Sequence, residues 1–167
     1  MTIHDLVKQA VSHEANNWVL PILWGIARLC ENGVFGQIGF QNGTSALALL
    51  IAAAEANGHV YSMDIRECEE GQERVEREGY ADRHTFIHAD SAVASFPEQL
   101  DLLFIDGGHY YNDVAIDYER HRGSVNKNGV ILFHDPITAP GVARFLREQK
   151  IPYFELGSGL GMEVVRG

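Results

Sequence analysis

Cysteine is scarce in this chain of 167 residues, which contains only Cys30 and Cys68. The two are not spaced as a pair, which argues against a disulfide scaffold and against a structural zinc site. Light cysteine usage fits a reducing compartment, and we expect a cytoplasmic protein. Residues 1–17 are polar and amphipathic and show no secretory leader.

Long apolar runs are also missing. The longest, residues 18–30, is interrupted by Pro21, Gly25 and Arg28. A membrane-spanning helix needs about 20 apolar residues, so we expect a core helix here and no membrane partner.

Positive charge is in short supply, with 13 Lys and Arg against 23 Asp and Glu and a net charge of −10. Because contacts to phosphate groups need cationic side chains, this balance argues against a nucleic-acid partner. Much of the acid lies in residues 64–82, where Glu and Arg alternate as on a solvent-exposed helix face. The length and the hydrophobic fraction of 46% predict one globular domain over residues 1–167.

The order of the predicted elements favours an α/β fold. Residues 1–31 are expected to form two N-terminal helices, and residues 32–167 an α/β core in which strands alternate with helices. This alternation predicts a parallel sheet covered on both faces, and a closing hairpin adds one antiparallel strand. The expected helices are roughly 3–14, 17–31, 43–57, one within 64–82, 91–96, 111–125 and 139–149. The expected strands are 33–40, 59–65, 84–90, 100–106, 128–135, 151–156 and 161–167.

Ligands of such sheets bind beyond the carboxyl ends of the strands, so the residues that follow each strand are the candidates. The first strand is followed by "GQIGFQNGTS". Gly39 and Gly43 let backbone approach a ligand, and Thr44 and Ser45 begin a helix whose N–H groups can hold an anion. The spacing of these glycines is not the G-x-G-x-x-G of dinucleotide sites. The alternative is that the glycines only form a tight turn between strand and helix.

Polar residues also follow the second and third strands. Asp64 either accepts hydrogen bonds from ribose hydroxyls or caps the acidic helix. Asp90 and Ser91 either contact an adenine edge or cap the short helix at 91–96. Position alone leaves both alternatives open.

Two carboxylates follow the fourth and fifth strands, and each has a histidine nearby. If these strands are neighbours, Asp106 and Asp135 share one edge of the sheet, where they repel unless a proton or a cation lies between them. Oxygen ligands with room for water suit Mg²⁺ or a similar ion. His109 is placed to take a proton from a substrate hydroxyl. The alternative is that both carboxylates are helix caps and loop formers.

Five segments, "GQIGFQNGTSALAL", "HVYSMDI", "HADS", "LLFIDGGHYYNDVAID" and "GVILFHDP", together resemble the class I S-adenosylmethionine-dependent methyltransferases. Within that class the chain is similar to small-molecule O-methyltransferases near the macrolide-sugar and cephalosporin-hydroxylase-like groups, and more distantly to catechol O-methyltransferases. The resemblance runs from about residue 33 to the C-terminus. It implies a three-layer, Rossmann-like, seven-stranded and mostly parallel sheet with a C-terminal antiparallel β-hairpin.

The resemblance implies S-adenosylmethionine (SAM) as the cofactor. It places Gly39, Gly43 and Thr44 around the methionine part of the cofactor. It places Asp64 on the ribose hydroxyls, and Asp90 with Ser91 at the adenine. Gln37 stands where the family has an acidic residue, and it can hydrogen-bond the ammonium group without charge assistance. The implied cofactor-binding residues are Gln37, Gly39, Gly43, Thr44, Asp64, Asp90, Ser91 and Asp106.

In metal-dependent members the two aspartates after the fourth and fifth strands bind the metal, which implies Asp106 and Asp135. The residue three positions after the first is the general base, here His109. Pro136 stands in place of the asparagine ligand of the catechol enzymes. His134 stands in place of an acid of the sugar enzymes and is either a ligand or a strand-end residue.

The predicted activity is methyl transfer from SAM to a hydroxyl of a small molecule, assisted by Mg²⁺ or a similar cation, with His109 and Asp106 as catalytic residues. One alternative is a non-catalytic or metal-independent SAM-binding protein. Another is a nicotinamide-dependent oxidoreductase, which the absent glycine pattern counts against. No long insertion supplies a lid, so either the acceptor is small or a second subunit of a homo-oligomer covers it.

Overall fold

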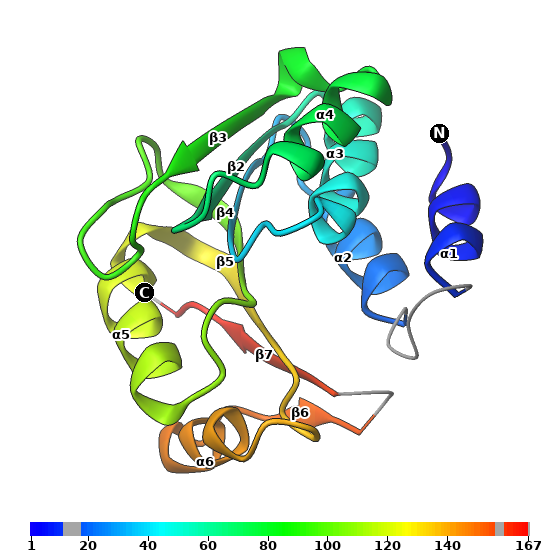
Figure 1. The fold of residues 1–167 in the computed structure, drawn as a ribbon. Coiled ribbons are helices and arrows are strands. Elements are labelled where there is room, and N and C mark those ends of the chain that lie inside the picture. Colours follow the sequence, from blue (N-terminus) through cyan, green and yellow to red (C-terminus); the bar gives the residue numbers. More distant parts are fainter. Residues whose placement is uncertain (12–17, 156–158, 167) are drawn as a thin grey trace.

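A computed structural model describes residues 1–11, 18–155 and 159–166 (Figure 1). Its centre is a seven-stranded sheet of order β3-β2-β1-β4-β5-β7-β6. The strands are β1 (Val34–Ile38), β2 (His59–Asp64), β3 (His84–His88), β4 (Leu100–Ile105), β5 (Val125–His134), β6 (Tyr153–Phe154) and β7 (Leu160–Val164). The helices are α1 (Ile3–Val11), α2 (Val19–Ala27), α3 (Thr44–Ala56), α4 (Glu69–Arg77), α5 (Tyr111–His121) and α6 (Pro140–Gln149).

Strand pairing confirms the predicted sheet. β3, β2, β1, β4 and β5 pair in parallel, whereas β7 pairs antiparallel with both β5 and β6. The chain builds β1, β2 and β3 outward in one direction and then returns to place β4 on the other side of β1. Strand order therefore reverses between β1 and β4, which is where open α/β sheets bind ligands.

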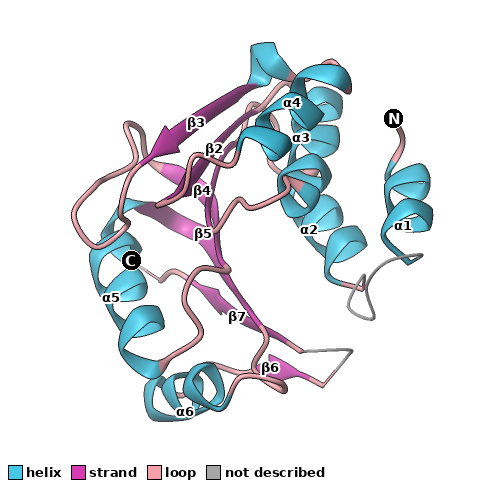
Figure 2. Ribbon diagram, viewed as in Figure 1, coloured by secondary structure: helices cyan, strands magenta, loops and turns pink. Residues whose placement is uncertain are grey.

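The sheet is covered on both faces, with α1 to α4 on one side and α5 and α6 on the other (Figure 2). The position of strand β4 between the two layers of helices explains its continuously apolar sequence. Leu102 and Phe104 pack in the core beneath α2 and α3, while Leu103 and Ile105 pack in the core beneath α5 and α6. A central parallel strand has no solvent-facing side, so every position from 102 to 105 is apolar.

Helix α3 is buried around most of its circumference, with every residue from 46 to 53 buried. It packs on the sheet, and α1 and α2 contact it as an outer cover. Helix α2 ends at Ala27 rather than at residue 31, because the N–H groups of Leu29 and Cys30 bond to Ile26 and Ala27 in tight turns. Positions 12–14 and 17 of the predicted helices lie outside the described residues. Within the described ranges, no helix has the length and apolar character needed to cross a membrane.

The helix predicted over 91–96 is wrong, since residues 91–93 form a turn and residues 94–96 have no regular secondary structure. The carbonyl of Asp90 accepts the N–H groups of Val93 and Ala94, which closes a single turn. Arg120 of α5 then donates to the carbonyls of Val93 and Ala94, with 2.7 Å to the latter. A helix over 91–96 would leave these two carbonyls without intrahelical donors, since residue 97 is a proline with no N–H, and in the structure Arg120 satisfies them.

The helix predicted over 111–125 is too long. Helix α5 ends at His121, a 3-10 turn covers Arg122–Ser124, and β5 begins at Val125 instead of residue 128. Val125 pairs with Leu100 and is 5% exposed. Ladder pairing and burial of Val125 therefore outweigh the helical pattern that precedes it.

Candidate active site

A cavity of about 550 Å³ opens where β1, β2, β3 and β4 end. A smaller cavity of about 80 Å³ lies beside it, between the starts of α2 and α3 and the ends of β4 and β5. Asp106 and Gly39 line both cavities. The predicted residues that line the larger one are Gly39, Asp64, Asp90, Ser91 and Asp106, and those that line the smaller one are Gly39, Thr44, Asp106 and His134.

The larger cavity is strongly acidic. Its wall carries the carboxylates of Asp64, Asp90, Asp106, Asp113 and Asp117. Arg66 also lines it but is ion-paired with Asp64, at 3.4 Å between Nε and Oδ1. Such a wall favours a ligand with positive charge and disfavours a pyrophosphate.

Asp64 is held by backbone rather than by a helix end. Its Oδ2 accepts the N–H groups of Phe40 at 2.9 Å and Gln41 at 3.1 Å, and its Oδ1 accepts that of Arg66 at 2.9 Å. Burial raises the pKa of Asp64, but these hydrogen bonds outweigh it and lower the pKa to about 2. The capping alternative is wrong, because α4 begins only at Glu69. The ionised carboxylate instead ties the loop after β1 to the end of β2.

Gly39 lets the loops after β1 and β4 meet. It has φ +88°, a conformation that favours glycine, and a Cβ at this position would collide with the carbonyl oxygen of Asp106. Its N–H donates to the carbonyl of Met63 at 2.9 Å, and the N–H of Asp106 donates to that of Ile38 at 2.9 Å. The glycine therefore sets how closely Asp106 approaches both cavities.

Three other residues of the predicted cofactor loop do not line the larger cavity. Gln37 is fully buried and lines neither cavity; its Oε1 has no hydrogen-bond partner. Gly43 is the N-cap of α3 and also lines neither cavity. Thr44 lines the smaller cavity, and its hydroxyl oxygen accepts a hydrogen bond from Arg74 at 2.7 Å. The structure thus brings Thr44, but not Gln37 or Gly43, to a cavity wall.

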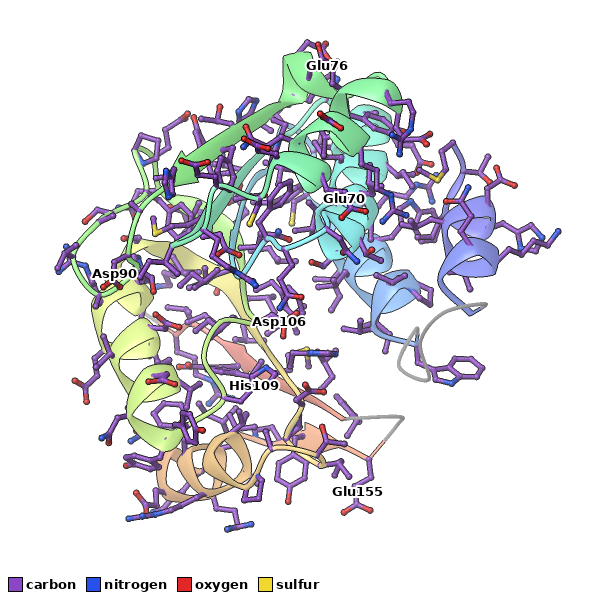
Figure 3. All side chains as sticks on the ribbon, in the orientation of Figure 1. Glu70, Glu76, Asp90, Asp106, His109 and Glu155 are labelled. Carbon is purple, nitrogen blue, oxygen red and sulfur yellow. The ribbon has the colours of Figure 1, made fainter. Side chains whose placement is uncertain are left out.

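Four side chains gather at the ends of β4 and β5: Asp106, His109, His134 and Asp135, whose donor atoms lie within 4.8 Å of one another. Ile105 pairs with Phe133 in the parallel ladder, so the residues that follow, Asp106 and His134, become neighbours. Figure 3 shows Asp106 at the end of its strand and His109 on the loop beyond it. Because parallel strands end at one edge, residues 28 apart in sequence form a single cluster.

The distances in the cluster join each imidazole to both carboxylates. Nδ1 of His134 lies 2.9 Å from Oδ1 of Asp106 and 3.5 Å from Oδ1 of Asp135. Nε2 of His109 lies 3.4 Å from Oδ1 of Asp106 and 3.6 Å from Oδ2 of Asp135. The side chain of His109 is 43% exposed, whereas that of His134 is 14% exposed. His109 is therefore the member that an incoming substrate can reach.

Asp135 carries two signs of a functional position. Its backbone has φ +61°, which costs a non-glycine residue free energy, although aspartate tolerates it better than most. Its Oδ1 is buried and has no hydrogen-bond partner. Leaving such an oxygen unpaired costs about 1–3 kcal/mol, which a bound cation would relieve. The donor set of two carboxylates and two imidazoles thus fits a divalent cation.

Hydrogen bonds to Asp106 also set the protonation of the cluster. The bond to Asp106 raises the pKa of His109 and outweighs the opposing effect of burial. Burial raises the pKa of Asp106, but the bonds from His109 and His134 bring it below its ordinary value. These hydrogen bonds therefore favour an ionised Asp106 and a proton on His109.

Sequence reasoning missed two buried polar residues of α5. Asp117, 4% exposed, accepts a hydrogen bond from the hydroxyl of Ser91 at 2.6 Å. His121, 1% exposed, lies with Nε2 at 2.9 Å from the carbonyl oxygen of Ser91. Burial raises the pKa of Asp117 and lowers that of His121. A signal was available, because Val114, Asp117 and His121 form one helical stripe with the spacing of buried positions.

The sequence pattern that defines a family described as "Methyltransferase domain" matches residues 37–136. The chain belongs to this methyltransferase family. The matched part of the methyltransferase runs from within β1 to just beyond β5 and contains all four residues of the cluster.

Solved structures share the fold of this methyltransferase at low sequence identity. SAH-bound PaMTH1 from Podospora anserina is 13% identical with TM-score 0.81, covering 99% of this chain and 88% of that one. An O-methyltransferase from Bacillus cereus in complex with SAH is 17% identical with TM-score 0.75, covering 98% and 90%. TomG from Streptomyces achromogenes, an O-methyltransferase in complex with SAM, is 14% identical with TM-score 0.75, covering 92% and 82%.

Two curated relatives match short stretches of the methyltransferase. Uncharacterized protein y4gI of Sinorhizobium fredii is 38% identical over 53 residues, which is 32% of this chain and 6% of that protein. Uncharacterized protein R132 of Acanthamoeba polyphaga mimivirus is 44% identical over 41 residues, 25% of this chain and 19% of that protein. The matched stretches are therefore small parts of both relatives.

Proposed function

We propose that this methyltransferase transfers a methyl group from SAM to a hydroxyl of a small molecule. The observation that carries the proposal is the position of Asp106, which lines both cavities and belongs to the acidic and histidine cluster. The cavity of about 550 Å³ is of a size typical for a cofactor. A cofactor in it and an acceptor at the cluster would meet at Asp106, within reach of His109.

The charge of the larger cavity supports SAM over a nicotinamide dinucleotide. SAM carries a sulfonium and an ammonium group against one carboxylate, so it is a net cation. A nicotinamide dinucleotide carries a pyrophosphate, which the five carboxylates of the wall would repel. The matched family and the SAM- and SAH-bound relatives of the same fold agree with this choice.

Within the cavity each polar group suits one part of SAM. Asp64 is ionised, ends β2 and lines the cavity, where ribose hydroxyls can donate to its carboxylate. Asp90 and Ser91 follow β3 and suit the adenine, and the hydroxyl of Ser91 is fixed by its hydrogen bond to Asp117. Gly39 and Thr44 lie toward the smaller cavity and suit the methionine part.

The two histidines suit different roles because they differ in exposure. His134 is enclosed at the end of β5, so with Asp106 and Asp135 it would hold a divalent cation. His109 is on a loop and 43% exposed, so it would take the proton from the substrate hydroxyl. When bound, SAM supplies an electrophilic methyl group, and the cation supplies a positive charge that lowers the pKa of the hydroxyl. The residues contribute mainly by positioning the two reactants.

One observation favours a metal-independent variant of the same function. Nδ1 of His134 lies at hydrogen-bond distance, 2.9 Å, from Oδ1 of Asp106. A protonated His134 can neutralise the carboxylate in this way, and the deprotonated fraction of His109 would then serve as the base without a cation. Absence of a chelator effect on methyl transfer would select this variant.

The proposed function also implies a cellular compartment and a class of partner. Cys30 and Cys68 are both free thiols in the structure, which fits a reducing compartment such as the cytoplasm. A small-molecule acceptor, with neither nucleic acid nor membrane as partner, fits the net charge of −10.

The test has two parts. Calorimetric titration with SAM and with NADH establishes which cofactor binds. Release of S-adenosylhomocysteine is then measured with a panel of catechols and hydroxylated sugars, with and without EDTA. Binding of SAM with turnover of at least one acceptor supports the proposal. Binding of NADH without SAM contradicts it.

A further inference from the structure

The three residues that would hold the cation offer one imidazole nitrogen and two carboxylates. Mg²⁺ prefers an octahedral shell of oxygen ligands and usually keeps several waters. Imidazole nitrogen instead suits iron, cobalt, nickel and zinc, and affinity for mixed nitrogen and oxygen sites rises along the first-row series. We propose that Asp106, His134 and Asp135 prefer a first-row transition-metal dication over Mg²⁺, and that His134 sets this preference. The inference rests on the proposed function, whose cation it narrows.

His134 is a nitrogen donor that the fold holds in place. It is the last residue of β5, where it pairs with Leu160 of β7, and its side chain is 14% exposed. Its ring packs edge to face on Phe104, with centroids 5.8 Å apart. A ligand fixed by a central strand and by packing is presented without loss of loop or rotamer freedom. A cation at this site would therefore meet a preset nitrogen.

The oxygen atoms converge on the same nitrogen. Nδ1 of His134 lies 2.9 Å from Oδ1 of Asp106 and 3.5 Å from Oδ1 of Asp135. The Oδ1 of Asp135 is the buried oxygen without a hydrogen-bond partner, held there by a left-handed backbone. This oxygen lies within ion-pair distance of the imidazole but has no hydrogen-bond partner, and the two donors together point to a ligand between the two strand ends.

His109 reaches the same space from the loop, with Nε2 at 3.4 Å and 3.6 Å from the two carboxylates. If His109 also bound the cation, its nitrogen would strengthen the preference for a transition-metal dication. If His109 serves as the base, His134 remains as the nitrogen ligand. In both arrangements His134 is the enclosed donor, so the preference belongs to this residue.

The test compares Co²⁺ and Mg²⁺ binding to the metal-stripped protein by calorimetry, and records the visible absorption of the Co²⁺ complex. We expect Co²⁺ to bind about a hundredfold more tightly than Mg²⁺. His134→Asp replaces the nitrogen by oxygen and should lower this ratio about tenfold or more, with a shift of the absorption bands. His134→Asn, a neutral replacement, serves if the aspartate variant does not fold by circular dichroism. His4→Asn, at an exposed position of α1, should leave the ratio unchanged.

Three results would overturn the inference: no binding of Co²⁺, a wild-type ratio below about tenfold, or an unchanged ratio in the folded His134 variants. SAM titrations on the same samples separate this failure from failure of the proposed function. SAM binding without Co²⁺ binding removes the metal preference and leaves methyl transfer in place. Selective Co²⁺ binding without SAM binding supports the preference and contradicts methyl transfer.

Discussion

Oδ1 of Asp106 lies 2.9 Å from Nδ1 of His134 and joins the end of β4 to the end of β5. The parallel register, with Ile105 opposite Phe133, produces this contact. Asp106 also lines both cavities. The pair therefore fixes the point at which a cofactor in one cavity would face an acceptor beside the other.

Replacing His109 tests the proposed base. His109→Ala should lower kcat by about 10²–10⁴-fold, because general-base catalysis contributes roughly that much. Binding of SAM should be nearly unchanged, since His109 lines neither cavity. The rate of S-adenosylhomocysteine release measures the first effect and calorimetry the second. His4→Ala is the matched control, and near-wild-type turnover of His109→Ala would remove this residue from the base role.

Replacing Asp64 should affect both stability and binding. Asp64→Asn replaces one carboxylate oxygen by an N–H₂ group. That group would face the N–H groups of Phe40 and Gln41, or that of Arg66, which then lose their acceptor. We expect a loss of about 1–3 kcal/mol in the free energy of unfolding, together with weaker SAM binding. Urea denaturation and calorimetry measure the two effects. Asp82→Asn, at an exposed position, is the control, and equal stability of the two variants would contradict the prediction.

Arg120 should control the order of the loop after β3. Its guanidinium donates to the carbonyls of Val93 and Ala94, so Arg120→Ala frees both. We expect faster hydrogen exchange at residues 91–95 and SAM binding weakened by several-fold, because Ser91 and its neighbours line the cavity. Arg77→Ala on the exposed face of α4 is the control. Unchanged exchange in 91–95 would show that the loop is held by Asp117 and His121 without this arginine.

His84 should make the fold sensitive to mild acid. Burial, with the nearby charge of His59, lowers the pKa of His84 to about 4. The unfolded chain, with a histidine pKa of about 6.5, then binds more protons between these values. Titration of His84 therefore does not lower the free energy of unfolding above about pH 6.5, but lowers it progressively as the pH falls toward 4. Between pH 7 and pH 5 the loss is about 1–2 kcal/mol.

His84→Gln measures this contribution, because glutamine does not titrate and can still hydrogen-bond the hydroxyl of Ser62. Urea midpoints at pH 7 and pH 5 should fall less for the variant than for the wild type. His121, whose pKa burial also lowers, titrates in both proteins and so cancels in the comparison. An equal fall in both proteins would show that His84 is not the group responsible.

Much of the fold was predictable because its signals are local. The apolar run 102–105 and the alternation of strands and helices predict a buried parallel sheet, and this in turn predicts that Asp106 and Asp135 share an edge. Where a helix was expected at 91–96, the chain forms a single turn whose carbonyls are held by Arg120, a residue distant in sequence. The roles of Asp117 and His121 were missed for the same reason, since their partner Ser91 is 26 and 30 residues away. Contacts between distant segments are not visible in local patterns.

The measurement that tests the central claim most directly is calorimetric titration of the wild-type protein with SAM and, separately, with NADH. The acidic cavity at the ends of β1 to β4 should bind the cationic SAM with a Kd of about 1–100 μM, and Asp64→Asn should weaken it about tenfold or more. NADH, with its pyrophosphate, should give no saturable heat. Saturable binding of NADH with none of SAM would contradict the account.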